Sequence, residues 1–497
     1  MKNIYLLLLL VFGFGANVLA QKKNKNTKPY PFGNPVITHM YTADAAPHVM
    51  PDGRVYMVTS VDSEKGGGYS TMHAYHLFSS ANMKDWTDHG EVLHVNDVKP
   101  AEADPNEKWA LWAPDMIYRN GKYYLYFPVR ILHNEYWDEA GKRHREVTSY
   151  IAVAECDQLG DRFKVTTPKL ANTKGIDPAV FIDDNDKVYL YWGMHMAAEL
   201  AEDMNSFASE PKSLKLDTDR FMEAIWMNKY KDRYYLSFHT KYDHAKKLTA
   251  ATIADPNRTP SELAYCVGDH PLGPFEYKGV LNYELGVNVK NGPESPHGDF
   301  VPWRQTQSNH GGIVEFHGQE YLFYHTSALS SWRQDEFQDK GTWTQRSVCV
   351  DQLNYQENGD IIPVQQTIEG VKAVKVDQPY AIDLKPLFDI VYTASNKERI
   401  FKFKNVDMGT GYYYLDLNFN KDPGAGIIEV RKGDENGLLL GTISYNEAQE
   451  SNITFLRSAK GEAEIVLVFK NFEKTLARKH LKQVRMFAGA PLSVSNI

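Results

Sequence analysis

A short pattern built around tyrosine recurs five times along the chain and constrains the fold more than any other feature. Each copy begins with a turn-forming pair and continues as a strand of aromatic and branched residues. Each copy also follows another short apolar strand, so the repeating unit is strand, tight turn, strand. The copies are DGRVYMVTS (52–60), NGKYYLYFP (120–128), NDKVYLYWG (185–193), KDRYYLSFH (231–239) and HGQEYLFYH (317–325).

The spacing of these copies indicates a radial arrangement of small sheets. The shared tyrosines lie 68, 65, 46 and 86 residues apart, and no helical period of comparable length separates them. Antiparallel sheets repeated around an axis leave only short, protected edges. Five units therefore predict an all-β fold with a five-bladed β-propeller. A β-sandwich is the alternative, but sandwich strands rarely repeat one motif so evenly.

Three acids precede their repeat tyrosines by the same number of residues. Asp44, Asp177 and Glu223 each lie 12 residues before the tyrosine, whereas Asp115 misses this offset and is expected to be structural. Equivalent positions in propeller blades point to equivalent places around the axis, so we expect three carboxylates at one mouth of the channel. Gathering like charges is costly, and such clusters are typical of functional sites. In glycoside hydrolysis one acid protonates the leaving oxygen and another activates water, while a third keeps the donor protonated.

Residues 35–370 resemble glycoside hydrolase family 43, whose five-bladed propeller enzymes act mostly on arabinofuranosides and β-xylosides, with inversion. The motifs that carry this resemblance come from every blade. They are NPVITHMYTADAAPHV, LWAPDMIYRNGKYYLYFPV, IDPAVFIDDNDKVYLYWG, FMEAIWMNKYKDRYYLSFHT and SNHGGIVEFHGQEYLFYHTSAL.

The resemblance implies a separate role for each acid. Asp44 would be the general base, Asp177 the acid that orients and tunes the proton donor, and Glu223 the general acid. The chain departs from the family directly after Glu223, where Ala224 and the next residue replace the usual Gly-Pro. Glu294, in a long insertion before the fifth copy, is a rival proton donor that lacks the 12-residue offset.

Four further residues acquire roles from the same resemblance. His310 matches the central histidine associated with a bound metal, often calcium, in the axial channel. Arg346 matches a substrate-contacting arginine of the fifth blade. Trp112 and Trp226 would line the sugar pocket. The alternatives are a buried histidine without metal and an arginine in a structural salt bridge.

A second domain follows once the repeat stops, after about residue 371. Alternating segments with turns between them predict a β-sandwich of about 120 residues. The segments GIIEVRKGDENGLLLGTI and EIVLVFK resemble a family 6 carbohydrate-binding module. The usual sugar-binding asparagine near the last strand is missing, so a domain that only supports the propeller is an equal alternative. The expected domains are a signal peptide (1–20), the propeller (28–370) and the sandwich (372–497).

The first residues have the pattern of a secretory signal peptide. Lys2 is the positive end, an apolar run extends from Ile4 to Phe14, and Val18-Leu19-Ala20 is a small-residue cleavage site. This run is shorter than the roughly 18–20 residues that span a membrane. We therefore expect a periplasmic or secreted protein without membrane insertion after cleavage. The net charge of −8 argues against nucleic acid as a partner, because binding phosphates needs a basic face.

These observations combine into one hypothesis with named alternatives. The chain is expected to be an exported, inverting exo-glycosidase that releases terminal pentose, foremost α-L-arabinofuranose, from side chains of plant cell-wall polysaccharide. A β-xylosidase and a galactan-directed glycosidase are the alternatives among enzymes. A non-catalytic carbohydrate-binding propeller is the alternative from another class, and the complete set of three acids argues against it.

Overall fold

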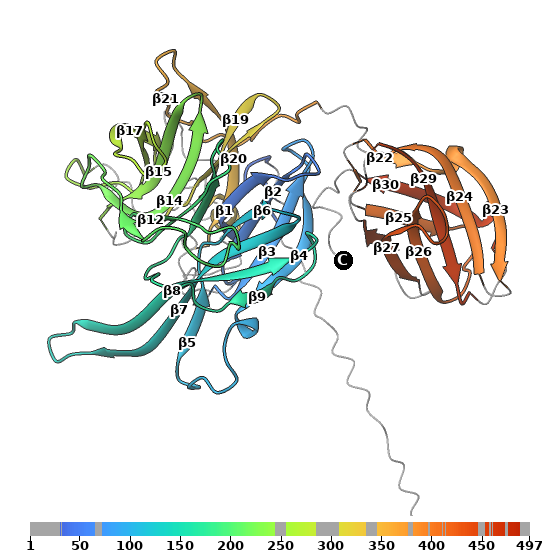
Figure 1. The fold of residues 1–497 in the computed structure, drawn as a ribbon, viewed down its shortest axis with the longest axis horizontal. Helices are drawn as coiled ribbons and strands as arrows, with labels where there is room; N and C mark the ends of the chain where they lie inside the picture. Colours follow the sequence, from blue (N-terminus) through green and yellow to red (C-terminus); the bar gives the residue numbers. More distant parts are fainter. Residues whose placement is uncertain are drawn as a thin grey trace, which may run out of the picture.

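The computed structural model describes residues 30, 32–64, 72–243, 255–284, 308–333, 345–375 and 381–487, the last range with gaps at 396–397, 410, 413, 446–452, 457–458, 460 and 473–475. Within these residues the chain is almost entirely β structure (Figure 1). The strands form two groups of sheets, one from the N-terminal three quarters of the chain and one from the C-terminal quarter. No helix among the described residues is long and apolar enough to cross a membrane.

Four sheets of the first group each contain four strands that pair in sequence order. The first two are β1 (Thr42–Val49), β2 (Val55–Val61), β3 (Ala74–Ser80) and β4 (Thr87–His94), and β10 (Ala179–Ile182), β11 (Val188–Trp192), β12 (Met196–Glu199) and β13 (Lys212–Ser213). The other two are β14 (Phe221–Tyr230), β15 (Arg233–Thr240), β16 (Leu263–Gly268) and β17 (Glu276–Asn282), and β18 (Gly312–Phe316), β19 (Gln319–Thr326), β20 (Ser347–Tyr355) and β21 (Ile361–Ile362).

The remaining sheet of the first group is larger. It contains β6 (Asp115–Arg119), β7 (Lys122–Trp137), β8 (Arg143–Cys156) and β9 (Lys164–Thr167), and the short strand β5 (Lys108–Leu111) also pairs with β7. The central strands β7 and β8 are longer than any other pair, and they continue past the sheet as a two-stranded arm (Figure 1).

The five sheets close into a ring. The strand that opens the repeated hairpin in each sheet contacts the equivalent strand of the next sheet, in the order β1, β6, β10, β14, β18 and back to β1. This arrangement confirms the predicted five-bladed propeller with this strand innermost. The repeated tyrosines lie buried on the second strands. The turn before each of those strands contains a residue with positive φ, which is Gly53, Asn120, Asp186, Lys231 or His317.

The second group of sheets forms the predicted β-sandwich. One sheet has the order β22 (Ala381–Asp383), β30 (Leu481–Phe487), β25 (Tyr414–Phe419) and β28 (Ile453–Phe455). The other has the order β23 (Phe388–Ser395), β24 (Glu398–Asp407), β29 (Glu462–Lys470), β26 (Gly426–Lys432) and β27 (Leu438–Tyr445). Buried apolar side chains from both sheets share one core.

The sandwich contacts the first blade of the propeller. The guanidinium of Arg54, which is buried, donates a hydrogen bond to the main-chain oxygen of Gly411. The hydroxyl of Tyr414 donates to the main-chain oxygen of Asp88 at 3.2 Å, and its ring packs with the propeller core. The sandwich is therefore held against the propeller by buried groups.

Candidate active site

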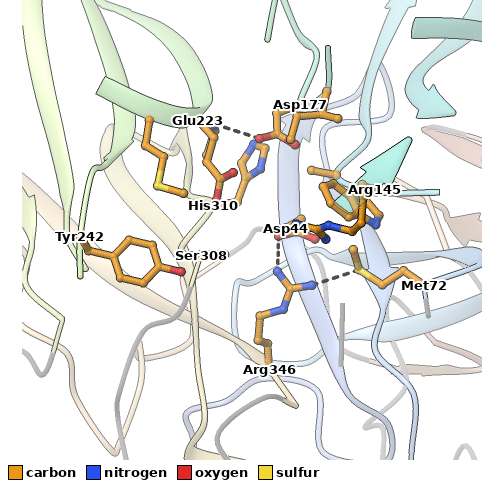
Figure 2. Close-up of a pocket in the computed structure, with 14 residues that line it drawn as sticks. Asp44, Met72, Arg145, Asp177, Glu223, Tyr242, Ser308, His310 and Arg346 are labelled. Atoms are coloured by element: carbon orange, nitrogen blue, oxygen red, sulfur yellow. Dashed lines mark hydrogen bonds and ion pairs between the residues drawn. The ribbon is translucent and has the colours of Figure 1, made fainter. Parts of the chain in front are cut away.

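A cavity of about 280 Å³ lies at the ends of the inner strands. The acids from three blades and three of the four other predicted site residues line it, and their side chains face one another across it (Figure 2). The lining residues are Asp44, Met72, Trp112, Ala113, Arg145, Ile176, Asp177, Met222, Glu223, Ala224, Tyr242, Ser308, His310 and Arg346. The common 12-residue offset thus brings the three acids together.

Local backbone irregularities aim these acids into the cavity. Asp44 and Asp177 have φ values of 55° and 54°, a left-handed conformation that residues other than glycine seldom adopt. Asp44 lies where the pairing of β1 and β2 shifts register, and Glu223 lies at a similar shift in β14. Such bulges re-aim side chains. Ala224 follows with φ 63°, so alanine here keeps the left-handed shape that glycine would adopt more easily.

Asp44 is a buried carboxylate held by several hydrogen bonds. The hydroxyl of Ser60 donates to one of its oxygens, and Nη1 of Arg346 donates to the other at 2.9 Å. Nδ1 of His325 lies 3.8 Å from the carboxylate. Burial alone would raise the pKa of Asp44, but Arg346 and the neighbouring histidines outweigh it and lower this pKa below its usual value. Asp44 is therefore ionised and able to accept a proton.

Arg346 is fixed by a second acid on its other side. Its Nε and Nη2 donate to the two carboxylate oxygens of Asp62, at 3.0 Å and 2.9 Å, and the guanidinium is almost completely buried. This paired geometry holds the guanidinium rigidly. Arg346 lines the cavity, and its partners include Asp44, Asp62 and Sδ of Met72. Its first role here is to hold Asp44.

A main-chain group of the next blade holds Asp177. Its carboxylate accepts a hydrogen bond of 3.0 Å from the main-chain N–H of Ala224, and the side chain is buried. Burial raises the pKa of Asp177 well above its usual value, and the negative charges of Glu223 and Asp44 raise it further. Asp177 consequently retains a proton at a pH where an exposed aspartate would be ionised.

Glu223 lies between Asp177 and a buried histidine. Nδ1 of His239 is 3.5 Å from its carboxylate, and 22% of the Glu223 side chain is exposed to the cavity. Burial opposes ionisation, but His239 and His310 outweigh it and lower the pKa of Glu223. Because Asp177 and Glu223 repel each other strongly, the two carboxyls titrate as a pair. At a pH between the lowered pKa of Asp44 and the raised pKa of Asp177, Asp44 is ionised while the pair retains one proton.

The repeat contains a further signal that the sequence analysis missed. Ser60, His239 and His325 each lie four residues after the repeat tyrosine of their blade. In the structure Ser60 and His325 contact Asp44, and His239 contacts Glu223. In blades one and four this position faces the acid of the same blade across the first hairpin, and in blade five it faces the acid of blade one. The same alignment that revealed the acids would have revealed it.

Trp226 does not lie where the resemblance placed it. It is 4% exposed, packs within the propeller core and is absent from the cavity wall. Its indole Nε1 donates to the main-chain oxygen of Ile313 at 3.1 Å, and its ring lies 5.1 Å from that of His48. The ring therefore fills the space between blades four, five and one. The expectation that Trp226 contacts sugar is wrong in this structure.

The other predicted residues occupy different places. Trp112 lines the cavity, and the guanidinium of Arg130 lies 4.7 Å from the centre of its ring. Asp115 is structural, because its carboxylate contacts His48 at 2.7 Å and accepts the N–H of Val180 at 2.7 Å. The rival donor Glu294 lies outside the described residues.

His310 was expected to lie beside a bound calcium ion. It lines the cavity and is buried. The described residues contain no group of three His, Cys, Asp or Glu side chains placed to bind a metal directly. Calcium takes six to eight oxygen ligands, so a calcium ion beside His310 would depend largely on water. These residues do not form a direct calcium site, and the proposed hydrolysis has no step that involves calcium.

The fold and the site together define a class of enzyme. Carboxylates from three propeller blades surround one cavity, and Asp44 and Asp177 are buried while Glu223 is partly exposed. One of them is ionised and the other two share a proton, as the acid and base of a glycoside hydrolase require. Comparison with known proteins gives the family: the profile of glycosyl hydrolases family 43 matches residues 32–278. The chain belongs to this family of inverting glycoside hydrolases.

Two curated relatives are similar over nearly their whole length. Xylosidase/arabinosidase 43A of Humicola insolens is 31% identical over 386 residues, which cover 66% of this chain and 98% of that protein. A xylosidase/arabinosidase of Bacteroides ovatus is 30% identical over 382 residues, covering 66% and 95%. Among solved structures, an arabinoxylan arabinofuranohydrolase of Bacillus subtilis in complex with cellotetraose matches 92% of this chain and 96% of that chain, with a TM-score of 0.55 and 21% identity. This last likeness concerns the fold.

Proposed function

We propose that this protein is an exo-acting glycosidase that removes terminal α-L-arabinofuranose from the side chains of arabinoxylan. The observation that carries the proposal is the small cavity in which Asp44, Asp177 and Glu223 meet. A cavity of about 280 Å³ suits a chain end better than the interior of a polysaccharide. The two similar curated relatives are named xylosidase/arabinosidase, which supports a terminal pentose as the sugar.

The proposed reaction is a single displacement with inversion. Asp44, ionised and held by Arg346, accepts a proton from a water molecule while the water oxygen bonds to the anomeric carbon. The glycosidic bond breaks on the opposite face of the sugar, and the leaving oxygen takes a proton from Glu223. This pathway requires roughly 6.5–9.5 Å between the carboxyl groups of Asp44 and Glu223, so that water fits between them.

Glu223 is the proposed donor because its side chain is the more accessible member of the proton-sharing pair. Asp177 is buried and fixed by the N–H of Ala224, whereas Glu223 is partly open to the cavity. The raised pKa of Asp177 keeps a proton within the pair. Transfer of that proton to Glu223 prepares the donor, and the pair is reprotonated after the leaving group departs.

A β-xylosidase is the second candidate. Both relatives are named xylosidase/arabinosidase, so their names support a xylosidase as much as an arabinosidase. The volume of the cavity suits either pentose. The test is a panel of 4-nitrophenyl glycosides: α-L-arabinofuranoside, β-D-xyloside and β-D-galactoside. We expect the arabinofuranoside to give the highest kcat/KM, and NMR of the first-released sugar to show the inverted anomer. A higher kcat/KM for the xyloside would establish the second candidate, and no hydrolysis of any of them would reject the proposal.

We also propose that the protein is exported, with residues 1–20 as its signal peptide. The pattern of the first residues supports this location, and these residues lie outside those the structure describes. A polymeric cell-wall substrate requires an enzyme outside the cytoplasm. The proposed domain limits are 28–370 and 372–497. Within the part of the sandwich that the structure describes, no residue lines the cavity.

A further inference from the structure

The arm formed by β7 and β8 projects from the propeller (Figure 1). Its strands pair in register as far as Trp137 and Arg143, and Glu135 pairs with Arg145. Arg145 lines the cavity (Figure 2). The part of the arm beyond Arg145 therefore begins at the cavity and leads away from it.

One face of this arm continues the cavity wall. Residues two apart on a strand point to the same face, so Arg143 lies on the face of Arg145. Residues directly opposite in an antiparallel pair also share a face, which places Trp137 and Glu135 there. Tyr136 and its partner His144 lie on the other face. Trp137 is displaced from Arg145 by two strand positions, or about 7 Å.

Trp137 is a large apolar side chain that the fold leaves uncovered. It is 66% exposed, the highest value among the large apolar side chains of the described residues. The guanidinium of Arg143 lies over its ring at 6.0 Å, and Arg143 is in turn paired with the carboxylate of Glu135. A cation over the ring holds the indole in place. The indole contributes nothing to the core, although it is held in a defined position.

We propose that Trp137 stacks against a sugar residue of the polysaccharide main chain, beside the cavity. This inference rests on the proposed function. An indole offers a flat face with negative charge density, which attracts the weakly positive C–H groups on the face of a sugar ring. The carboxylate of Glu135 neutralises Arg143. The exposed indole of Trp137, which we call the platform, therefore suits an uncharged polysaccharide chain. Its continuity with Arg145 places it next to a sugar whose side branch enters the cavity.

The test compares a polymer with a small substrate. We measure kcat/KM for arabinose release from soluble arabinoxylan and for hydrolysis of 4-nitrophenyl α-L-arabinofuranoside, and we take the ratio of the two. A lower fraction of folded enzyme reduces both kcat/KM values equally, so it does not change this ratio. Trp137→Ala should lower it about 2- to 10-fold, through KM for the polymer, and Trp137→Phe should restore part of the loss. Tyr136→Ala is the matched control, since it removes an exposed ring of the same arm from the opposite face.

The outcomes separate this inference from the proposed function. An unchanged ratio in Trp137→Ala, or an equal fall in Trp137→Ala and Tyr136→Ala, would overturn the platform. If the wild-type enzyme hydrolyses none of the aryl glycosides, the proposed function fails instead. Affinity electrophoresis in gels containing arabinoxylan then still tests Trp137, because retardation measures binding without turnover. Weaker retardation of Trp137→Ala than of Tyr136→Ala would support sugar stacking by Trp137. Equal migration of the two variants would contradict it.

Discussion

The main-chain N–H of Ala224 donates a hydrogen bond of 3.0 Å to the carboxylate of Asp177. Ala224 belongs to blade four and Asp177 to blade three, so this bond joins two blades at the cavity. Both residues have left-handed backbone conformations, with φ values of 63° and 54°. The strained backbone of Ala224 therefore aims the N–H that positions Asp177 beside Glu223.

The side chain at position 224 should control catalysis through this backbone. Glycine adopts positive φ at no steric cost, whereas a β-branched residue there is strongly disfavoured. We expect Ala224→Gly to keep kcat/KM within about twofold, and Ala224→Val to lower it about tenfold or more through loss of the hydrogen bond to Asp177. Melting temperatures measured alongside would separate this effect from unfolding. Similar kcat/KM values for the two variants would contradict the proposed role.

Arg346 should set the acid limb of the pH profile. It helps to lower the pKa of Asp44, which must be ionised to accept a proton from water. Replacement by methionine removes the cation, so the pKa of Asp44 rises and the acid limb of kcat/KM moves to higher pH. Arg346→Lys keeps a charge and should move the limb less. An unmoved acid limb in Arg346→Met would show that Asp44 is not the titrating base.

The buried pair of Asp62 and Arg346 should matter for stability as well. Asp62→Ala leaves the guanidinium with fewer buried partners, and breaking a buried pair costs about 3 kcal/mol. Asp269→Ala is the control: Asp269 pairs with Arg233 but is 87% exposed, and exposed pairs contribute about 0–1 kcal/mol. Urea unfolding measures both. Equal losses would mean that the Arg346 pair is no more important than a surface pair.

The leaving group should distinguish the general acid from the general base. A dinitrophenyl group departs without a proton, whereas a sugar hydroxyl needs one. Glu223→Ala should therefore lose about 100-fold or more on an oligosaccharide and much less on a dinitrophenyl glycoside. Asp44→Asn should lose activity on both alike, since water must be activated in either case. Equal losses for Glu223→Ala would transfer the donor role elsewhere, and Glu294 would be tested next.

His239 should set the alkaline limb. It lowers the pKa of Glu223, and activity falls as pH rises through the pKa of the proton donor. His239→Gln removes part of this influence, so the pKa of Glu223 rises and the alkaline limb of kcat/KM moves up. Asp177→Asn leaves Glu223 to titrate without the repulsion of a second carboxyl, so the pKa of Glu223 falls and the same limb should move down. Shifts of the same sign in both variants would contradict the assignment of Glu223.

Local patterns in the sequence determined the blades and the meeting of the acids. Turn pairs followed by aromatic strands specify hairpins through backbone preferences that depend on a few adjacent residues. Five such hairpins leave few ways to bury their apolar faces other than around an axis. The position of Asp44, Asp177 and Glu223 within the hairpin then places them at one mouth. The shared position of Ser60, His239 and His325, four residues after the repeat tyrosine, could have been recognised from the sequence in the same way.

Only the tertiary structure decided what those residues touch. Trp226 follows a register shift in β14, and it turns into the core beside His48 instead of the cavity. The guanidinium of Arg346 donates hydrogen bonds to both Asp44 and Asp62, which lie some 300 positions away in the sequence. The spacing in the sequence gives no sign that the β7–β8 arm carries Trp137 on the face of the cavity. Contacts between blades depend on bulges, twist and packing, which arise only when all the sheets are assembled.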